Sequence, residues 1–388
     1  MPVASPTASL LDRAAPSPAR FGILSTYPPT PCGLATFSAA LALGLKAHGA
    51  EVSVVRVADG SPSNAAGIVG ELVSGSPTSV SAAADLLNGC GVAIIQHEYG
   101  VYGGADGDEV VDILESLRVP SIVVAHTVLR EPTPHQRAVL ETVGDLADRV
   151  VVMSRAARDR LCAGFDVDPE KVVMIPHGAA TPHTSAAGLP LGRPTLLTWG
   201  LVGPGKGIER VIAAMPRLRE VRESPRYLVV GRTHPKVLAA DGEAYRNARR
   251  EQARHAGVAG SVLFDASYRD VSSLTTIISS AAVVLPYDSR EQATSGVLVD
   301  AIAAGRPVVA TAFPHAVEML ASGAGIVVDH DDPDAMVLAL RRLLNEPDVA
   351  ASMAAEASRI APSLGWPVVA AAYLDVTSRV LAGRPALV

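Results

Sequence analysis

Three small residues mark a place where this chain can bind a phosphate group. Thr294, Ser295 and Gly296 stand directly before the largely apolar run 297–303, so a helix is expected to begin there. The first turn of a helix leaves backbone N–H groups unpaired, and small side chains let a phosphate reach them. Asp300 follows about one turn later on the same side, where a carboxylate can accept hydrogen bonds from a ribose. We interpret the segment as a binding site for a nucleoside diphosphate. The alternative is an ordinary capped helix start.

A glycine-rich loop at 199–207 is a second candidate phosphate contact. It follows a predicted strand, and its glycines let Lys206 meet a phosphate as a point charge. Arg232, directly after the next strand, is a candidate second cation. The alternatives are an exposed loop lysine and a solvated arginine. The spacing GxxxxGK[ST] is absent, which disfavours a nucleoside triphosphatase.

Polar residues also follow two strands predicted in the first half of the chain. His97, Glu98 and Tyr99 follow one of them, and His126 follows the next. Such residues at strand ends can bind sugar hydroxyls or move protons, although a lone histidine can also be purely structural. Zinc is disfavoured because no third ligand has a fitting spacing, and we expect no metal site.

The first predicted strand ends in a stiff loop, 25–34, with three prolines and with Gly33 just before a helix. Glycine there allows close approach of the backbone to a ligand. The loop is not a GxGxxG fingerprint. Asp59 follows the second strand, where a nicotinamide ribose would need an acid, but without the fingerprint a dinucleotide dehydrogenase is disfavoured.

Short apolar runs alternate with helical patterns on both sides of a linker at 178–194. This alternation predicts parallel sheets covered on both faces. The predicted strands are Phe21–Leu24, Val52–Val57, Val92–Gln96, Ser121–Ala125, Val150–Met153 and Val172–Ile175, then Thr195–Thr198, Tyr227–Val230, Val262–Phe264, Ala282–Leu285, Arg306–Thr311 and Gly325–Val328.

The predicted fold class is α/β, with two Rossmann-like doubly wound domains facing a central cleft. The first domain is expected over 20–185 and the second over 195–364. Residues 1–19 are predicted to be a disordered tail and not a signal peptide. A final apolar helix is predicted over 366–382, and its return onto the first domain is left open.

The composition limits the class of protein. Among 388 residues, 48% are hydrophobic and 19% charged, which is ample for two sizeable cores. The net charge of −6 gives no basic footprint for nucleic acid. Cys32, Cys90 and Cys162 lack metal-ligand spacing and indicate reduced thiols in the cytoplasm. No apolar stretch reaches the roughly 18 residues that span a bilayer, which leaves contact with a membrane surface open.

Taken in order, these motifs resemble the retaining GT-B glycosyltransferases of glycosyltransferase family four. The resemblance runs from Phe21 to the C-terminal helix. It is carried by the loop before Gly33, His126-Thr127, the turn Ile175-Pro176-His177-Gly178, Lys206-Gly207 and the block Glu291–Thr311.

The resemblance implies transfer of a hexosyl group from a nucleoside diphosphate sugar, with no further cofactor, to a sugar, glycolipid or polysaccharide. Lys206 would contact the diphosphate, the Ser295–Val297 amides would cap its terminal phosphate, and Asp300 would bind the ribose. His126 would face the transferred sugar. The implied catalytic residues are His126, Lys206 and Glu291. The implied donor-binding residues are Gly33, Lys206, Arg232, Gln292, Thr294, Ser295, Gly296, Val297 and Asp300, and the acceptor-side residues are His97, Glu98 and Tyr99.

The chain departs from the family pattern at two places. The family usually has two glutamates separated by seven residues, and here that register gives Gln292 and Asp300, with Glu291 one place early. An arginine usually found shortly before the lysine is Leu201. Either Glu291 acts after a one-residue shift or Gln292 has replaced the glutamate. A GT-B sugar-nucleotide epimerase and a non-catalytic nucleotide-sugar binding protein therefore stay as alternatives.

Overall fold

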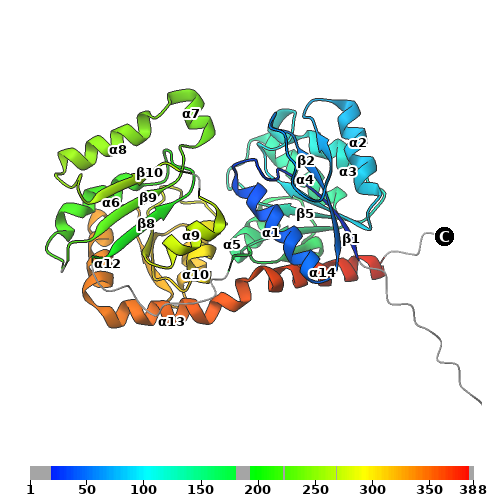
Figure 1. Ribbon diagram of the computed structural model, residues 1–388. Coiled ribbons are helices and arrows are strands. Elements are labelled where there is room, and N and C mark those ends of the chain that lie inside the picture. The colour runs from blue at the N-terminus through cyan, green and yellow to red at the C-terminus, as the bar shows by residue number, and fades with distance from the viewer. Residues whose placement is uncertain (1–18, 181–192, 222, 268, 384–388) are drawn as a thin grey trace, which may run out of the picture.

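The computed structural model describes residues 19–180, 193–221, 223–267 and 269–383. The predicted tail, except for residue 19, and most of the predicted linker lie outside these ranges. Within them the chain forms two α/β domains that lie side by side, each built on one parallel sheet (Figure 1). The prediction of two doubly wound α/β domains is confirmed.

The first domain contains a seven-stranded sheet among the described residues. In sheet order its strands are β3 (Ile68–Leu72), β2 (Glu51–Val57), β1 (Arg20–Ser25), β4 (Val92–His97), β5 (Ser121–Ala125), β6 (Arg149–Val152) and β7 (Val172–Met174). Its helices are α1 (Gly33–Ala47), α2 (Pro77–Asn88), α3 (Glu109–Glu115), α4 (Pro134–Leu146) and α5 (Arg155–Gly164), with short 3₁₀ turns at Ala105–Gly107 and Pro169–Lys171.

Strand β3 is absent from the sequence prediction, which has six strands in this domain. It pairs only with β2 and lies at the edge of the sheet. Val69 is 48% exposed, and a glycine, Gly70, stands mid-strand. A half-exposed edge strand lacks the continuous apolar run that identifies a buried strand.

The second domain contains a six-stranded parallel sheet within the described ranges. In sheet order its strands are β10 (Val262–Asp265), β9 (Arg226–Val230), β8 (Thr195–Trp199), β11 (Ala282–Leu285), β12 (Val308–Thr311) and β13 (Gly325–Val328). Its helices are α6 (Ile208–Ala214), α7 (Pro235–Asp241), α8 (Ala244–His255), α9 (Val271–Ile278), α10 (Gly296–Ala303), α11 (Pro314–Leu320) and α12 (Pro333–Asn345), with a 3₁₀ turn at Met215–Leu218.

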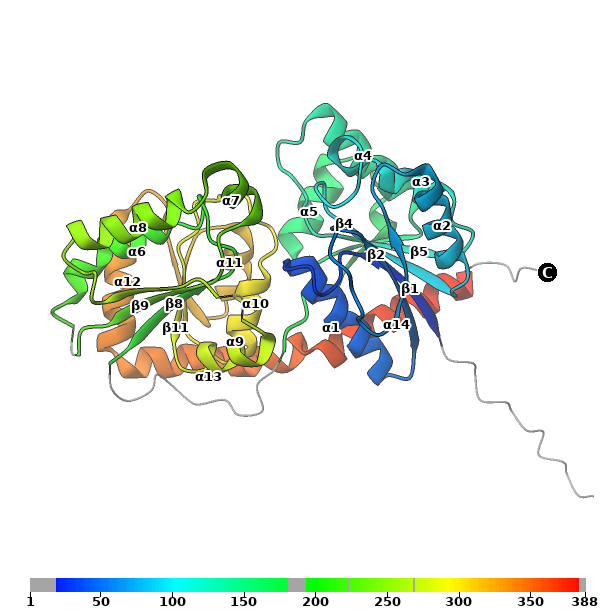
Figure 2. The same ribbon diagram turned by 45° about the horizontal axis from the view of Figure 1, so that its top comes forward.

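Two long helices close the chain and run beneath both domains, as Figures 1 and 2 show. Helix α13 (Pro347–Leu364) packs against α10 in the second domain, and α14 (Trp366–Gly383) packs against α1 in the first. Val369, Ala370 and Tyr373 of α14 are at most 1% exposed and join the core of the first domain. The final helix therefore completes the first domain.

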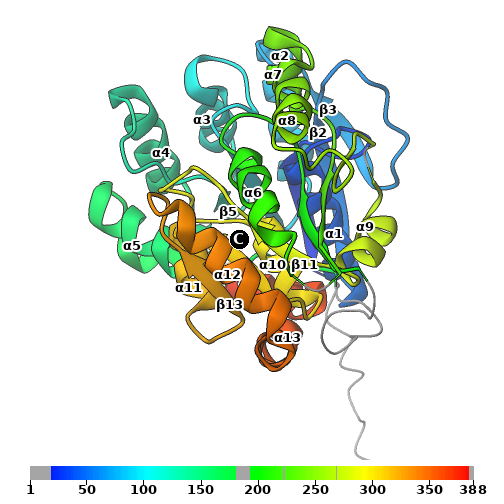
Figure 3. The ribbon, with the colours of Figure 1, turned by 90° about the vertical axis from the view of Figure 1, so that its left-hand side faces the viewer.

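Each sheet is covered on both faces by helices with apolar inner sides. In the first domain α2 to α5 cover one face, and α1 with α14 covers the other. In the second, α6 and α12 lie on one face, and α10 and α13 on the other (Figure 3). None of the helices in the described ranges combines the length and apolarity that crossing a bilayer requires.

Candidate active site

Loops that follow strands of the two sheets meet at the boundary between the domains. The Ser154 hydroxyl, after β6, donates to the carbonyl of Ala293, in the loop after β11 (2.6 Å). The Lys236 ammonium of α7 stands 3.3 Å from the position that a Cβ on Gly100 would occupy. The predicted site loops of both domains are therefore brought to one boundary, as expected for ligand-binding loops at the carboxyl ends of parallel strands.

The start of α10 is fixed by a cap and by a buried histidine. Ser295 is the N-cap residue, and its hydroxyl accepts a hydrogen bond from the Leu298 amide (3.3 Å). The Ser295 amide donates to Nδ1 of His315 (2.8 Å). Of the three amides predicted to cap a phosphate, those of Gly296 and Val297 alone lack an acceptor in the described part of the chain. The Ser295 amide is already used inside the fold.

Lys206 lies beside this helix start. Its ammonium stands over the Tyr287 ring, 4.4 Å from the ring centroid. A Cβ on Gly200 would lie 3.9 Å from the Lys206 ammonium and 4.0 Å from a methyl group of Val297, so both flank the same glycine. Gly207 has φ +61°, a conformation that favours glycine. Within the described ranges no carboxylate lies within ion-pair distance of Lys206, so its charge is open to an anion.

The surrounding loops of the second domain add charge of both signs. Burial raises the pKa of Asp300 to about 7, and no described residue hydrogen-bonds to its carboxylate. Burial, followed by the charges of Lys236 and Lys206, lowers the pKa of His234. Arg232 is exposed, and the described part of the chain gives its guanidinium no partner. The Lys206 side of the boundary is therefore cationic, with Asp300 as a separate acceptor.

The loop before α10 has a fixed backbone. The Gln292 side-chain amide donates to the Thr294 carbonyl (3.0 Å), and the Gln292 carbonyl accepts from the His315 amide (3.3 Å). The Glu291 carbonyl accepts from Arg160 of α5 (2.8 Å). No described residue hydrogen-bonds to the Glu291 carboxylate. Whether Glu291 or Gln292 fills the family's first glutamate position stays a prediction.

On the first-domain side, His126 is held as a neutral base. Its Nε2 lies 2.6 Å from Oε1 of Gln96, and its ring meets Phe37 edge-on with centroids 4.9 Å apart. Burial, together with the nearby His177 and His97, lowers the pKa of His126 to about 3. The imidazole is thus uncharged at neutral pH.

The predicted acceptor-side residues Glu98 and His97 differ in exposure, since Glu98 is partly exposed and His97 is buried. The Glu98 carboxylate accepts hydrogen bonds from the Thr127 hydroxyl (2.5 Å) and the Tyr99 amide (3.2 Å), and burial raises its pKa. His97 is 1% exposed and packs edge-on against Tyr99. It is the last residue of β4, so its side chain is buried in the sheet layer, whereas Glu98 is the first residue beyond the strand. His97 is therefore buried in this structure, and its contact with an acceptor stays a prediction.

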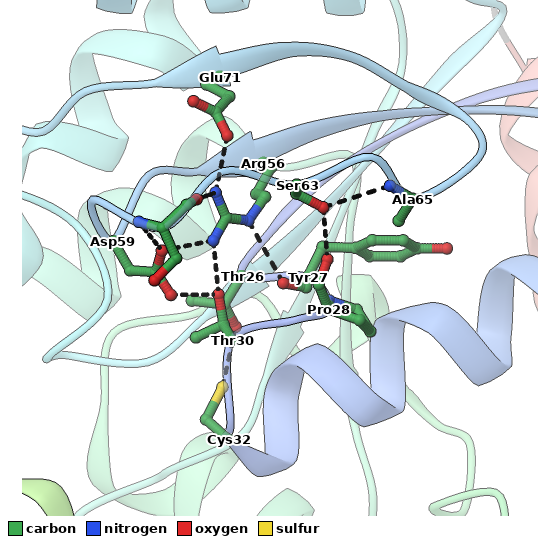
Figure 4. Close-up of polar contacts among 11 residues, drawn as sticks. Thr26, Tyr27, Pro28, Thr30, Cys32, Arg56, Asp59, Ser63, Ala65 and Glu71 are labelled. Carbon is green, nitrogen blue, oxygen red and sulfur yellow. Dashed lines mark hydrogen bonds and ion pairs between the residues drawn. The ribbon is translucent and has the colours of Figure 1, made fainter.

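The loop before Gly33 is anchored by a buried arginine, as Figure 4 shows. Arg56 is fully buried, and its five N–H groups all find acceptors. These are the carbonyls of Tyr27 (3.4 Å) and Ser61 (2.9 Å), the Thr30 hydroxyl (3.0 Å), and the carboxylates of Glu71 (2.7 Å) and Asp59 (2.5 Å).

Asp59 therefore acts as a hydrogen-bond acceptor in this network around Arg56. Although burial opposes ionisation, hydrogen bonds from Thr30 and Ser61 and the charge of Arg56 lower the pKa of Asp59 to about 2. The loop leads into Gly33, where an added Cβ would meet nothing within 4 Å. Gly33 thus presents open space at a fixed helix start.

Sequence reasoning names the turn that contains His177 but assigns that side chain no role. Its Nδ1 lies 2.7 Å from the Gly178 carbonyl, and a Cβ on Gly296 would lie 2.8 Å from its Nε2. Burial lowers its pKa to about 4. Like His126, His177 follows a strand, and this position in the sequence could have marked it as a candidate site residue. His315, which holds the Ser295 amide, follows a strand and lies 20 residues beyond Ser295, and no motif marks it.

The described residues include no group of three or more His, Cys, Asp or Glu side chains that could hold a metal ion. Two hollows on the first domain, one lined within 58–74 and one within 108–142, lie apart from Lys206 and α10. The candidate site is described by the charge of Lys206 and the free amides of Gly296 and Val297.

Comparison with known proteins supports the interpretation. The model for glycosyl transferases group 1 matches residues 183–360, and the model for Glycosyltransferase Family 4 matches residues 31–181. A D-inositol 3-phosphate glycosyltransferase of Kineococcus radiotolerans is 30% identical over 289 residues, which are 66% of this chain and 62% of the relative. A phosphatidyl-myo-inositol mannosyltransferase of Mycolicibacterium smegmatis is 31% identical over 186 residues, 48% of this chain and 45% of the relative. The chain thus spans less than two thirds of either relative.

Solved structures share the fold at low sequence identity. A sucrose-phosphate synthase from Thermosynechococcus elongatus superposes with a TM-score of 0.71 at 16% identity, covering 94% of this chain and all of that one. Anabaena HepE in complex with UDP-glucose gives 0.69 at 15% identity, covering 93% and 100%. The two family models match 31–181 and 183–360, one on each domain, and the chain therefore belongs to glycosyltransferase family 4, whose members share the GT-B fold.

Proposed function

We propose that the protein transfers a hexosyl group from a nucleoside diphosphate sugar to an acceptor hydroxyl, with retention at the anomeric carbon. The observation that carries this proposal is the position of an unpaired lysine, Lys206, beside two free helix amides, those of Gly296 and Val297. That combination is complementary to a dianionic diphosphate.

The step with the highest activation free energy in such a reaction is departure of the diphosphate from an oxocarbenium-like carbon. Lys206 and the positive end of α10 would stabilise the negative charge that develops on the leaving oxygen. These protein groups provide positive charge of their own, so the proposal requires no divalent cation. Asp300 would accept hydrogen bonds from the ribose of the donor. Retention is proposed from the family pattern.

The acceptor would enter from the first-domain side, near His126 and Glu98. Its oxygen would bond to the anomeric carbon on the face from which the diphosphate leaves, and its proton would pass to the leaving phosphate oxygen. Closure of the two domains would exclude water, which limits hydrolysis of the donor. Sugars, polyols, glycolipids and polysaccharides are the acceptor classes to test, and the relatives named for inositol phosphates put polyols first. The three cysteines are unpaired, which supports a cytoplasmic location.

The test begins with thermal shifts of the full chain in UDP, GDP and ADP sugars, because a ligand of the folded state must raise the melting temperature. The donor that binds is then incubated with and without acceptors, and the products are identified. A hexosylated acceptor supports the proposal. An altered sugar formed without acceptor indicates an epimerase, and binding without turnover indicates a binding protein. No stabilisation by any sugar nucleotide would refute donor binding.

A further inference from the structure

Helix α5 of the first domain is hydrogen-bonded directly to the loop at 291–293 of the second domain, which we call the donor loop. The Ser154 hydroxyl at its N-cap donates to the Ala293 carbonyl (2.6 Å). The Glu318 carboxylate of α11 accepts from the Arg155 amide (2.9 Å) and the Ala156 amide (3.0 Å), at the positive end of α5. The helix is therefore fixed against the second domain at its first turn.

Arg160, farther along the same helix, makes a second connection. One nitrogen of its guanidinium, Nη1, donates to the Val128 carbonyl (2.7 Å) and to the Glu291 carbonyl (2.8 Å). Val128 lies two residues after His126, in the loop that follows β5. Glu291 lies in the loop that leads to α10. A single nitrogen thus bridges the loop that presents His126 and the loop that presents the donor-binding helix start.

Arg160 is suited to this bridge by its surroundings. The residue is half-buried, and burial lowers the pKa of its guanidinium, while the Glu291 carboxylate favours the charged form and Arg130 opposes it. Hydrogen bonds from a charged donor are stronger than neutral ones, especially when partly removed from water. The two loops belong to different domains, so their mutual position depends on such bridges and not on the chain between them.

We infer that Arg160 is a positioning residue that sets the distance between the acceptor-side loop at 126–128 and the donor loop at 291–293. The inference rests on the proposed transferase function. By fixing that distance, Arg160 determines whether the activated hexosyl group meets an acceptor hydroxyl or water. Displacement of reacting groups by about 1 Å can lower a rate by about 10²-fold.

The test compares Arg160→Met with Arg158→Met in the full chain. Methionine keeps the apolar stem of Arg160 and removes both bonds. Arg158 lies on the exposed side of the same helix, and no described residue hydrogen-bonds to its side chain, so it is the matched control. Arg160→Lys, which keeps the charge, is the conservative variant and is expected to fall between the two. Donor transfer, donor hydrolysis without acceptor, and backbone hydrogen exchange are measured for each protein.

For Arg160→Met we expect the kcat of transfer to fall by roughly 10- to 100-fold while the donor KM changes by less than about threefold. The ratio of hydrolysis to transfer should rise, and exchange should accelerate in both 126–130 and 289–296. Exchange that accelerates in α5 alone, or transfer and hydrolysis that fall equally, would overturn the inference. If Arg160→Met does not fold, the same criteria apply to Arg160→Lys.

The two proposals fail in different ways. If the wild-type protein neither binds nor turns over any sugar nucleotide, the proposed function fails. Hydrogen exchange of the Arg160→Met protein still tests the inference in that case. Faster exchange in both 126–130 and 289–296 supports a bridging role for Arg160, and unchanged exchange in these loops refutes it.

Discussion

Two helices begin at the boundary between the domains, and they begin in the same way. Helix α1 starts at Gly33 after the cap residue Cys32, whose sulfur accepts from the Ala35 amide (3.4 Å). Helix α10 starts at Gly296 after Ser295. Each start leaves two amides without an acceptor among the described residues.

The difference between them lies in the neighbouring cation. Near α1, Arg56 directs every N–H group to acceptors of its own domain. Near α10, Lys206 stands over an aromatic ring with no carboxylate partner in the described ranges. A helix start is a common feature of α/β domains, whereas a cation beside one with no carboxylate partner is available to bind an anionic ligand. The comparison assigns the main anion site to the second domain and a supporting role to the first.

Removing the free cation should have the largest effect. Lys206→Ala is expected to lower kcat/KM for transfer by about 10²- to 10³-fold, because a preorganised charge is lost where the leaving diphosphate develops its own. The melting temperature should change little, since the ammonium makes no ion pair in the described fold. Steady-state kinetics and calorimetry check both expectations. Unchanged transfer would remove Lys206 from the mechanism.

Removing Arg56, whose N–H groups all have acceptors within the first domain, should instead lower stability. Arg56→Met leaves the Asp59 and Glu71 carboxylates without their guanidinium, and we expect the free energy of unfolding to fall by about 2–3 kcal/mol. These carboxylates stay partly hydrated, which limits the loss. Denaturant unfolding measures it. A large loss of activity with normal stability would contradict the contrast with Lys206.

The first glycine of each helix, Gly296 or Gly33, gives a further test of the difference between the two helix starts. Gly296→Ala places a Cβ 2.8 Å from Nε2 of His177, so the helix start must shift, and we expect a destabilisation of about 1–3 kcal/mol with roughly tenfold weaker donor binding. Gly33→Ala meets open space, and its stability should not fall. Loss of donor affinity in Gly33→Ala would therefore locate the donor itself at α1. Calorimetric binding and melting curves of both variants distinguish these outcomes.

A pH dependence of donor affinity is expected from Asp300. Burial raises its pKa to about 7, so the acceptor form is fully present only above that pH. We expect the affinity for a nucleoside diphosphate sugar, which does not titrate near neutrality, to rise by up to about tenfold from pH 6 to pH 8. In Asp300→Asn that rise should vanish. A wild-type affinity that is flat over the range would contradict the ribose assignment.

The same group bears on stability with a definite sign. Because the folded pKa lies above the ordinary value near 4, the folded state holds the extra proton between roughly pH 4 and pH 7. The contribution of Asp300 to stability therefore falls as pH rises through that window. Asp300→Asn should remove this part of the slope in denaturant titrations.

The alternation of strands and helices, the order of the loops and a helix start near Ser295 could all be predicted from the sequence. These features follow from local patterns, since a helix start and a buried parallel strand depend on neighbouring residues. The sequence also pointed to Lys206 and Asp300, because glycine-rich loops and first helical turns can be recognised from a few positions.

Which polar groups remain free follows from the folded structure and could not be predicted from local patterns. The burial of His97, the use of the Ser295 amide by His315, and the Arg160 bridge to Val128 and Glu291 depend on residues 20 to 131 positions apart or on packing within the sheet layers. The edge strand β3 and the packing of α14 on α1 belong to the same class. Such contacts form only when the sheets and helices pack together. A local sequence pattern specifies which face of an element a side chain occupies, but it does not specify which residue the side chain contacts.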